Sequence, residues 1–104
     1  MPTPILVITS MSDRELARRI SYQAVTGGLA AAAQIYPAES LYRWKGEVHE
    51  TAEYTVVFKS LEERFDALRR MIREQHSYQL PQIIALRIDL GDRDYLAWIA
   101  EQAG

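Results

Sequence analysis

Two long extended arms meet at the tight turn Trp44-Lys45-Gly46-Glu47, and this pair limits the folds open to the chain more than any other feature. Residues 41–44 before the turn and residues 53–59 after it are rich in β-branched and aromatic side chains, which predicts a β-hairpin. An arm from Ala30 to Trp44 would extend for about 50 Å, whereas a compact chain of this length is about 33 Å across. We therefore expect the hairpin to overhang its domain and to be covered by another copy of the chain.

Composition sets the remaining bounds. A chain of 104 residues with 48% hydrophobic content predicts one globular domain, residues 1–104. The net charge of −2 argues against a partner made of nucleic acid. The absence of cysteine excludes disulfides and thiolate metal sites. The first apolar run, Ile5-Leu6-Val7-Ile8, is short and has no basic region before it, so we expect no signal peptide, no membrane span and a cytoplasmic location.

The first half of the chain reads as a strand followed by a helix. The apolar run at residues 5–8 predicts a buried strand. Ser12 and Glu15 have the spacing of a capping box, which predicts a helix from Asp13 to about Thr26. Gly27-Gly28 supplies the backbone freedom that ends helices. The apolar stripe of this helix recurs every four residues and consists of Leu16, Ile20 and Ala24.

The segment after this helix has conflicting signals. The run Leu29-Ala30-Ala31-Ala32-Ala33 favours a helix by propensity, but Gly27-Gly28 and Pro37 leave too little length for a stable one. We interpret the run as a strand with small side chains. Proline cannot donate to a strand ladder, so Pro37 predicts a bulge or an edge position.

The second half of the chain repeats the same kinds of signal. Ser60 and Glu63 have capping-box spacing, which predicts a helix from Leu61 to about Gln75, and Ile83–Ile88 predicts a further strand. The apolar stripe of the second helix consists of Leu61, Phe65, Leu68 and Ile72. The order βαββαβ predicts an α+β, ferredoxin-like fold, in which both helices cover one face of an antiparallel four-stranded sheet.

A short terminal helix completes the predicted elements. Asp92 is its expected cap. Tyr95, Leu96 and Ile99 would lie against the sheet or a neighbour, and we interpret Tyr95 and Trp98 as core or interface anchors.

The order of elements and four sequence runs together resemble the CutA family of divalent-cation-tolerance proteins. The runs are Leu29-Ala30-Ala31, Tyr42-Arg43-Trp44-Lys45-Gly46, His76-Ser77-Tyr78-Gln79-Leu80-Pro81 and Asp94-Tyr95-Leu96-Ala97-Trp98. The resemblance covers nearly the whole chain. It implies a ferredoxin-like subunit in a tightly packed homotrimer, whose long hairpins join the sheets of neighbours as in PII-type signalling trimers.

The resemblance also implies a link to divalent metals, copper especially, through thiols and a histidine in some members. This chain departs from that pattern. Ala32 and Thr9 stand where some members have cysteine, His76-Ser77-Tyr78 replaces His-Pro-Tyr, and Gln82 replaces a glutamate. A soft, thiol-based Cu(I) site is therefore excluded, and any metal would rest on imidazole and oxygen ligands.

Four residues are candidates for a binding site, and a fifth, His49, is weighed against them. Tyr42, Trp44 and Tyr78 are candidates for lining a cleft between subunits, although such aromatics also pack at interfaces without any ligand. His76 is the candidate metal ligand. It follows a predicted helix end, where an imidazolium bonds free carbonyls, so capping or packing is the commoner role. His49 is interpreted as a solvent-facing strand residue.

No combination of residues indicates catalysis, since the chain lacks a cysteine nucleophile, a phosphate loop and a metal-catalytic histidine spacing. We expect a non-enzymatic homotrimer of the metal-tolerance type that binds a metal ion or small ligand between subunits. No cofactor is required, and copper would bind only weakly. One alternative is a purely structural trimer that presents a surface to a protein partner. Another is RNA binding, since an RRM places aromatics where this chain has Tyr54 and Phe58, but the acidic composition counts against it.

Overall fold

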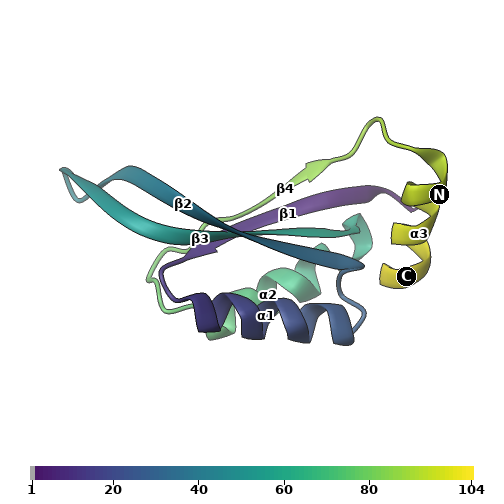
Figure 1. The fold of residues 1–104 in the computed structure, drawn as a ribbon, viewed down its shortest axis with the longest axis horizontal. Helices are drawn as coiled ribbons and strands as arrows, with labels where there is room; N and C mark the ends of the chain where they lie inside the picture. The colour runs from purple at the N-terminus through teal and green to yellow at the C-terminus, as the bar shows by residue number, and fades with distance from the viewer. Residues whose placement is uncertain (1) are drawn as a thin grey trace.

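The computed structural model describes residues 2–104 and has a four-stranded antiparallel sheet with two helices on one face (Figure 1). The elements are β1 (Pro4–Met11), α1 (Arg14–Thr26), β2 (Ala32–Trp44), β3 (Glu47–Leu61), a 3₁₀ turn (Glu62–Arg64), α2 (Phe65–Gln75), β4 (Ile83–Arg87) and α3 (Arg93–Ala103). The strand order is β2-β3-β1-β4, and each neighbouring pair is antiparallel. This is the ferredoxin-like topology, so the predicted fold class is confirmed.

Strand alternation explains why the helices cover only one face. Every second residue of β1, and of β3 from Val56 to Ser60, is buried under α1 and α2, and Phe58 at the centre of this layer is 0% exposed. The predicted stripe of α1 and residues 65, 68 and 72 of α2 supply the other side of the core, whereas Leu61, also predicted for the second stripe, lies in β3 and in the smaller core beside α3. The main buried residues are Ile5, Val7, Met11, Leu16, Ile20, Val56, Phe58, Leu68 and Ile72. The first two helices and the sheet therefore bury each other's apolar side chains within one chain.

The hairpin of β2 and β3 overhangs this body, as predicted. The two strands pair without interruption from Ala32 opposite Lys59 to Trp44 opposite Glu47. Lys45 and Gly46 have φ angles of 51° and 80°, which are the two positive values of a type I′ turn. The molecule measures 44 × 25 × 22 Å, and the hairpin extends along its longest axis (Figure 1).

The edge position predicted for Pro37 is confirmed, and the bulge is not present. Pro37 lies opposite Tyr54 in an unbroken register. Because β2 is an edge strand of the sheet, the missing N–H of a proline removes no ladder bond on the outer side.

Three local predictions are wrong at the ends of elements. The cap of α1 is Asp13, not Ser12, because the Asp13 carboxylate accepts a hydrogen bond from the Glu15 amide at 2.9 Å. An acidic side chain is also favoured there by the helix dipole. The other two errors concern residues 29–31 and Ser60.

Residues 29–31 are not part of a strand. The amides of Leu29 and Ala30 donate to the Ala24 carbonyl at 2.9 and 3.3 Å, which satisfies an orphan group at the end of α1. Gly28, with φ of 75°, makes this reversal possible. The strand therefore begins only at Ala32.

Ser60 does not cap a helix. It lies within β3 opposite Ile5, and its hydroxyl donates to the Leu29 carbonyl at 2.6 Å. Pairing with β1 keeps the chain extended as far as Leu61, so α2 starts after the 3₁₀ turn at Phe65. The predicted end of α2 at Gln75 is confirmed.

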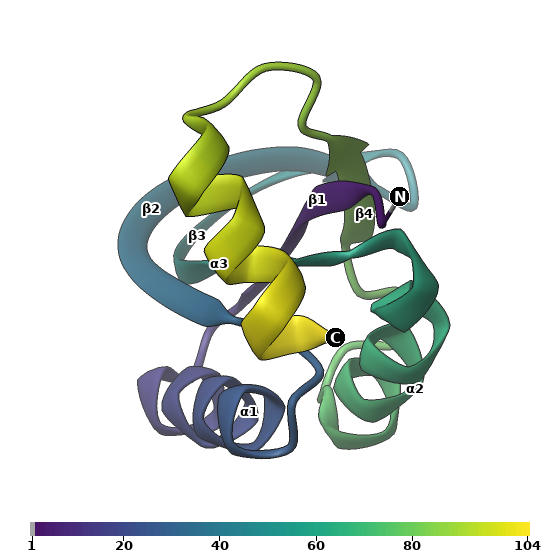
Figure 2. The same cartoon turned by 90° about the vertical axis from the view of Figure 1, so that its right-hand side faces the viewer.

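The last helix lies across the end of the sheet instead of on either face (Figure 2). Asp92 caps α3, as predicted, by accepting from the Tyr95 amide at 3.1 Å. Ile99 is buried in a second, smaller core with Leu61 and Ala103. Tyr95 and Trp98 are 43% and 39% exposed, so they are not core anchors of this chain, and an interface role for them stays a prediction.

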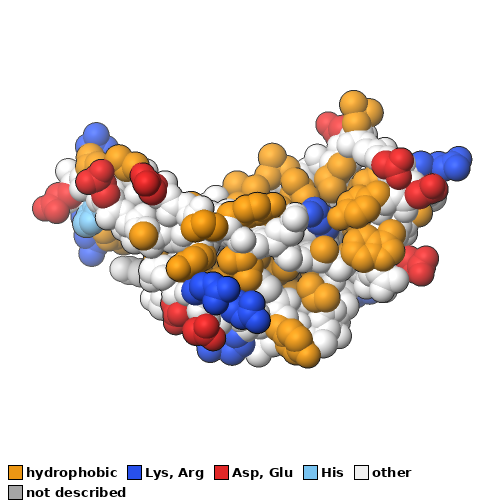
Figure 3. Space-filling model, in the orientation of Figure 1, with side chains coloured by type: hydrophobic (Ala, Val, Ile, Leu, Met, Phe, Trp, Pro, Cys, Tyr) orange, Lys and Arg blue, Asp and Glu red, His pale blue; other side chains and the backbone are white. Residues whose placement is uncertain are grey.

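The face of the sheet opposite the helices is apolar and open. Leu6 and Ile8 of β1 pair with Leu86 and Ile84 of β4, which are 49% and 48% exposed. Figure 3 shows hydrophobic side chains gathered on the hollowed upper side of the molecule, between the hairpin and the β4–α3 connection. The RNA alternative loses its support here, because Phe58 lies under the helices and not on this open face.

Among residues 2–104, no helix combines the length and the apolar character needed to cross a membrane.

Candidate functional site

A cleft of about 880 Å³ lies where the hairpin leaves the body of the sheet. Residues 39–44 of β2 form one side, and residues 77–82, which connect α2 to β4, form the other. Ser10 at the end of β1 and Glu53 of β3 also line it. The three aromatic residues predicted to line a cleft are brought together here, because Tyr42, Trp44 and Tyr78 all contribute to its walls.

Tyr78 and Glu53 form the most buried polar contact of the cleft. Glu53 is only 6% exposed, and the Tyr78 hydroxyl donates to its Oε2 atom at 2.7 Å. Burial raises the pKa of the Tyr78 hydroxyl above its ordinary value, and the hydrogen bond to Glu53 raises that pKa further. The phenol therefore keeps its proton at neutral pH and acts as the donor to the carboxylate.

His76 holds the connecting segment against the end of β1. The Tyr78 amide donates to its Nδ1 atom at 3.1 Å, so Nδ1 must be the unprotonated nitrogen. Nε2 then carries the proton and donates to the Ser10 carbonyl at 2.7 Å. The ring also lies 4.8 Å from the Tyr78 ring, centroid to centroid. His76 thus positions Tyr78. It is the C-cap residue of α2, as expected, but its ring bonds a carbonyl of β1 and not the helix carbonyls.

A second bond joins the far end of the connecting segment to β1. The Ser10 hydroxyl donates to Oε1 of Gln82 at 3.1 Å. Gln82 stands where the CutA resemblance leads us to expect a glutamate, and its amide oxygen accepts here without adding a charge. Ser10 therefore contacts both His76 and Gln82, and it anchors both ends of the segment.

The hairpin side of the cleft is ordered by cross-strand contacts. The rings of Tyr42 and His49 stack with centroids 5.5 Å apart and planes 12° apart, and the Tyr42 hydroxyl lies 3.2 Å from the Thr51 hydroxyl. His49 is therefore half-buried under an aromatic ring, and its interpretation as a solvent-facing residue is wrong in that respect. The Lys45 ammonium lies 5.8 Å from the centre of the Trp44 ring.

Sequence reasoning missed Glu53, the most buried charged residue of the cleft. Residues 53–59 read as one strand, and Glu53 was taken as part of it. The available signal was the alternation of side chains along a strand. Glu53 lies on the same face of β3 as Thr55 and Val57, which pair with residues of β1. A carboxylate placed on that face is unusual enough to indicate a site.

The side chains near His76 do not fit a tightly held divalent ion. Both ring nitrogens already have hydrogen-bond partners. Thr9 and Ala32, at the positions of the missing thiols, offer no strong ligand, and Thr9 is fully buried in the helix-side core. Within residues 2–104, no group of three or more histidine, cysteine, aspartate or glutamate side chains is arranged to hold a metal.

Comparison with known proteins identifies the family. The family model described as CutA1 divalent ion tolerance protein matches residues 5–102. The chain belongs to the CutA family. The divalent-cation tolerance protein CutA of Thermus thermophilus is 37% identical over 100 residues, which cover 95% of this chain and 97% of that protein. The resemblance drawn from the sequence is thus confirmed, and the family is named for divalent-cation tolerance, not for an enzymatic activity.

Two further CutA proteins broaden the comparison. The chloroplastic CutA 1 of rice is 34% identical over 96 residues, which cover 91% of this chain and 54% of the rice protein. The periplasmic divalent cation tolerance protein CutA of Archaeoglobus fulgidus has a solved structure with a TM-score of 0.93 and 29% identity, covering 97% of this chain and 99% of that one. The names of these CutA proteins place them in different compartments.

Proposed function

We propose that the protein is a non-enzymatic homotrimer of the divalent-cation-tolerance type, which binds a small ligand in clefts at the bases of its hairpins. The observation that carries the assembly is the open apolar face of the sheet. Ile84 and Leu86 leave about half of their surface in water there. Contiguous exposed apolar surface of this kind usually marks an interface.

The two free edges of the sheet favour a ring. β2 and β4 are the outer strands, and β2 reaches far beyond the body of its own subunit. Joining the β2 edge of one copy to the β4 edge of the next is a head-to-tail contact, which gives a ring when the rotation between copies closes, and not a two-fold dimer. The CutA resemblance implies three copies in that ring.

The same arrangement supports a ligand site. The cleft adjoins the part of the hairpin that a neighbour would cover, so a trimer would have three equivalent clefts between subunits. Its volume of about 880 Å³ is within the range of small-molecule sites. Its polar groups are already held in place by the bonds from Ser10, His76 and Tyr78.

Metal binding is a weaker part of the proposal. The named relatives are divalent-cation tolerance proteins, and the His76 ring contacts Tyr78 of the cleft wall. A metal ion at Nδ1 of His76 would have to displace the Tyr78 amide. We therefore propose that no cofactor is required and that copper binds weakly. We also propose that the protein acts in the cytoplasm.

The assembly is tested by light scattering coupled to size-exclusion chromatography across a micromolar dilution series. We expect the mass of three chains. The mass of a single chain at every concentration would overturn the trimer. A thermal-shift screen of metabolites and divalent ions on the same samples tests the ligand, because a compound that binds the native state raises its melting temperature. A trimer stabilised by none of them would support the purely structural alternative.

A further inference from the structure

Glu53 is a buried carboxylate without a cationic partner. It is 6% exposed, and no lysine or arginine of residues 2–104 lies within 4 Å of it. Its Oε2 atom accepts from the Tyr78 hydroxyl, and no donor in that part of the chain bonds Oε1. Burying a carboxylate costs several kcal/mol unless a cation or several donors compensate it. One neutral phenol compensates Oε2, and Oε1, which is not one of the fully buried atoms without a partner, remains accessible to a cation from the cleft.

The cationic side chain nearest in the cleft wall does not provide that compensation. Arg43 also lines the cleft. However, Glu53 lies opposite Ala38 in the ladder, and Arg43 is an odd number of residues further along β2. Because successive side chains alternate between the two faces of a strand, the Arg43 side chain projects from the face of the hairpin opposite to that of Glu53. Glu39, one residue beyond Ala38, projects from the same face as Arg43, so Glu53 is the one of the three charged residues lining the cleft that projects from its own face.

Three aromatic residues share the cleft with this carboxylate, and one of them, Tyr78, contacts it. Tyr42, Trp44 and Tyr78 line the same cleft. The face of an aromatic ring attracts a cation within about 6 Å, and aromatic rings are a recurrent element of sites that bind ammonium groups. The Lys45 ammonium, 5.8 Å from the Trp44 ring, makes such a contact within this chain.

From these observations we infer that the cleft binds a small organic cation, whose ammonium or guanidinium head pairs with Glu53 and packs against the rings of Tyr78 and Tyr42, while Trp44 lines the same cleft nearer the hairpin tip. This inference rests on the proposed function and specifies the ligand of the same cleft. A bare divalent metal is a poorer occupant, because Glu53 and the neutral rings do not provide the several oxygen or nitrogen ligands that such an ion needs.

Four small probes of similar size test the inference. They are n-butylammonium, n-butylguanidinium, the neutral n-butanol and the anionic butyrate. Binding is followed by the fluorescence of Trp44 in a Trp98→Phe background, since these are the two tryptophans of the chain and Trp98 lies on α3, away from the cleft. We expect both cations to bind at least tenfold more tightly than n-butanol, and butyrate not to bind.

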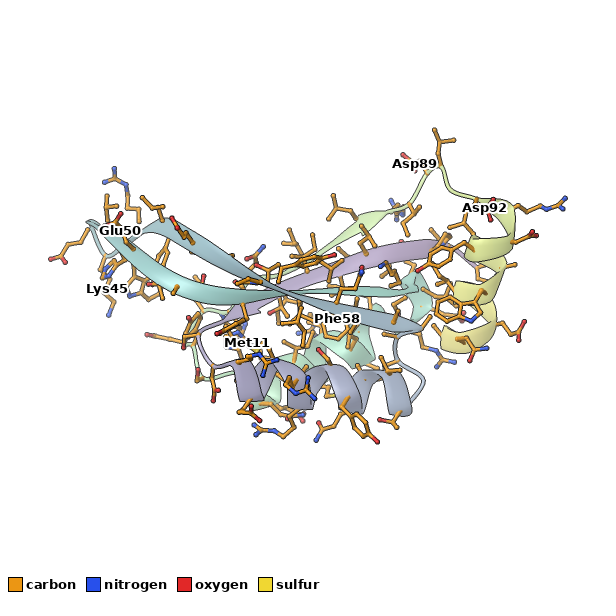
Figure 4. The ribbon with its side chains drawn as sticks, viewed as in Figure 1. Met11, Lys45, Glu50, Phe58, Asp89 and Asp92 are labelled. Carbon is orange, nitrogen blue, oxygen red and sulfur yellow. The ribbon has the colours of Figure 1, made fainter. Side chains whose placement is uncertain are left out.

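Two matched variants assign the effect to one carboxylate. Glu53→Gln should weaken binding of the cations at least tenfold and leave n-butanol unchanged. Glu50→Gln removes the same charge from the same strand, but Glu50 is exposed near the tip of the hairpin, as Figure 4 shows. It should change the dissociation constants by less than twofold. If Glu53→Gln does not fold, the comparison of butylammonium with butanol on the unaltered carboxylate still decides.

Three outcomes would overturn the inference. The first is equal affinity for butylammonium and butanol, and the second is unchanged cation binding by Glu53→Gln. The third combines two results: none of the cations binds the parent protein, and the Glu53→Gln trimer dissociates more readily than the parent trimer. That combination would mean that a cationic side chain of the neighbouring subunit pairs with Glu53. The mass is measured on the same samples. A trimer that binds neutral or anionic compounds alone contradicts only this inference, whereas a monomer contradicts the proposed function itself.

Discussion

The two faces of the sheet differ in what covers their apolar side chains. On the helix side, Phe58 and its neighbours are fully buried by α1 and α2 of the same chain. On the open side, Ile84 and Leu86 have the same apolar character but no cover. The first face stabilises the subunit by itself, and the second can contribute only when another molecule covers it. Of the two faces, only the open one should therefore contribute stability that depends on protein concentration.

Truncating the helix-side core should have the largest effect. Phe58→Ala removes a fully buried ring and should destabilise the subunit by about 3–5 kcal/mol. The loss should be the same at every protein concentration, because the contacts lie within one chain. Chemical denaturation at two concentrations measures it. A loss that grows on dilution would show that Phe58 acts through assembly.

Truncating the open face should give a smaller effect of a different kind. Leu86→Ala should cost about 2 kcal/mol if a neighbour covers this position, and the cost should appear as trimer dissociation at a higher protein concentration. Light scattering on a dilution series measures the shift. If the face remains in water, the change should stay within about 0.5 kcal/mol, and the contrast between the two faces would then have no bearing on assembly.

The contact between Tyr78 and Glu53 extends the comparison to pH. The pKa of Tyr78 is raised in the folded chain, so the protonated phenol stabilises the fold. That contribution is complete below the phenol's unfolded pKa of about 10, and it is lost as the pH rises through the higher folded value. Tyr78→Phe should cost about 1 kcal/mol at neutral pH. The variant should also lose less stability than the parent protein at alkaline pH, as measured by thermal unfolding from pH 7 to 11. Parallel curves for the two proteins would contradict this.

Copper binding should be the smallest effect. Nδ1 and Nε2 of His76 both have partners in the chain, so Cu(II) should bind weakly, although more tightly than other divalent first-row ions. Binding should fade in acid because a protonated imidazole cannot coordinate a metal. Calorimetric titration of the parent protein and His76→Ala at two pH values tests this. Equal binding by the variant would remove His76 as a ligand.

The hairpin and the helix stripes could be predicted because their signals are local. Positive φ at Gly46 matches the preference of glycine for such turns, and apolar residues at spacings of three and four predict α1 and α2. Ser60 could not be placed in this way. Its capping-box spacing is outweighed by pairing with Ile5, a residue 55 positions earlier.

The candidate site depends on similar long-range contacts. Tyr42, Trp44 and Tyr78 were identifiable because they lie in runs that carry the CutA resemblance; they line one cleft of this chain, and its place between subunits stays a prediction. The burial of Glu53 was not identifiable, because the residue that covers it, Tyr78, lies 25 positions further along the chain. Its approach depends in turn on the bond between His76 and the Ser10 carbonyl, across 66 positions. A pattern within a few neighbouring residues cannot reveal contacts between positions so far apart in the sequence.

The uneven length of the strands has a consequence for the order in which the molecule matures. Pairing between β1 and β3 ends at Met11 and Tyr54, so residues 38–53 form a ribbon of two strands with no third strand beside it. Such a ribbon is at best marginally stable in water by itself. In the proposed trimer, the body of each newly made subunit can fold first, and its ribbon becomes rigid only when the neighbours arrive. The walls of the cleft that belong to this ribbon would then be completed by assembly and not by folding.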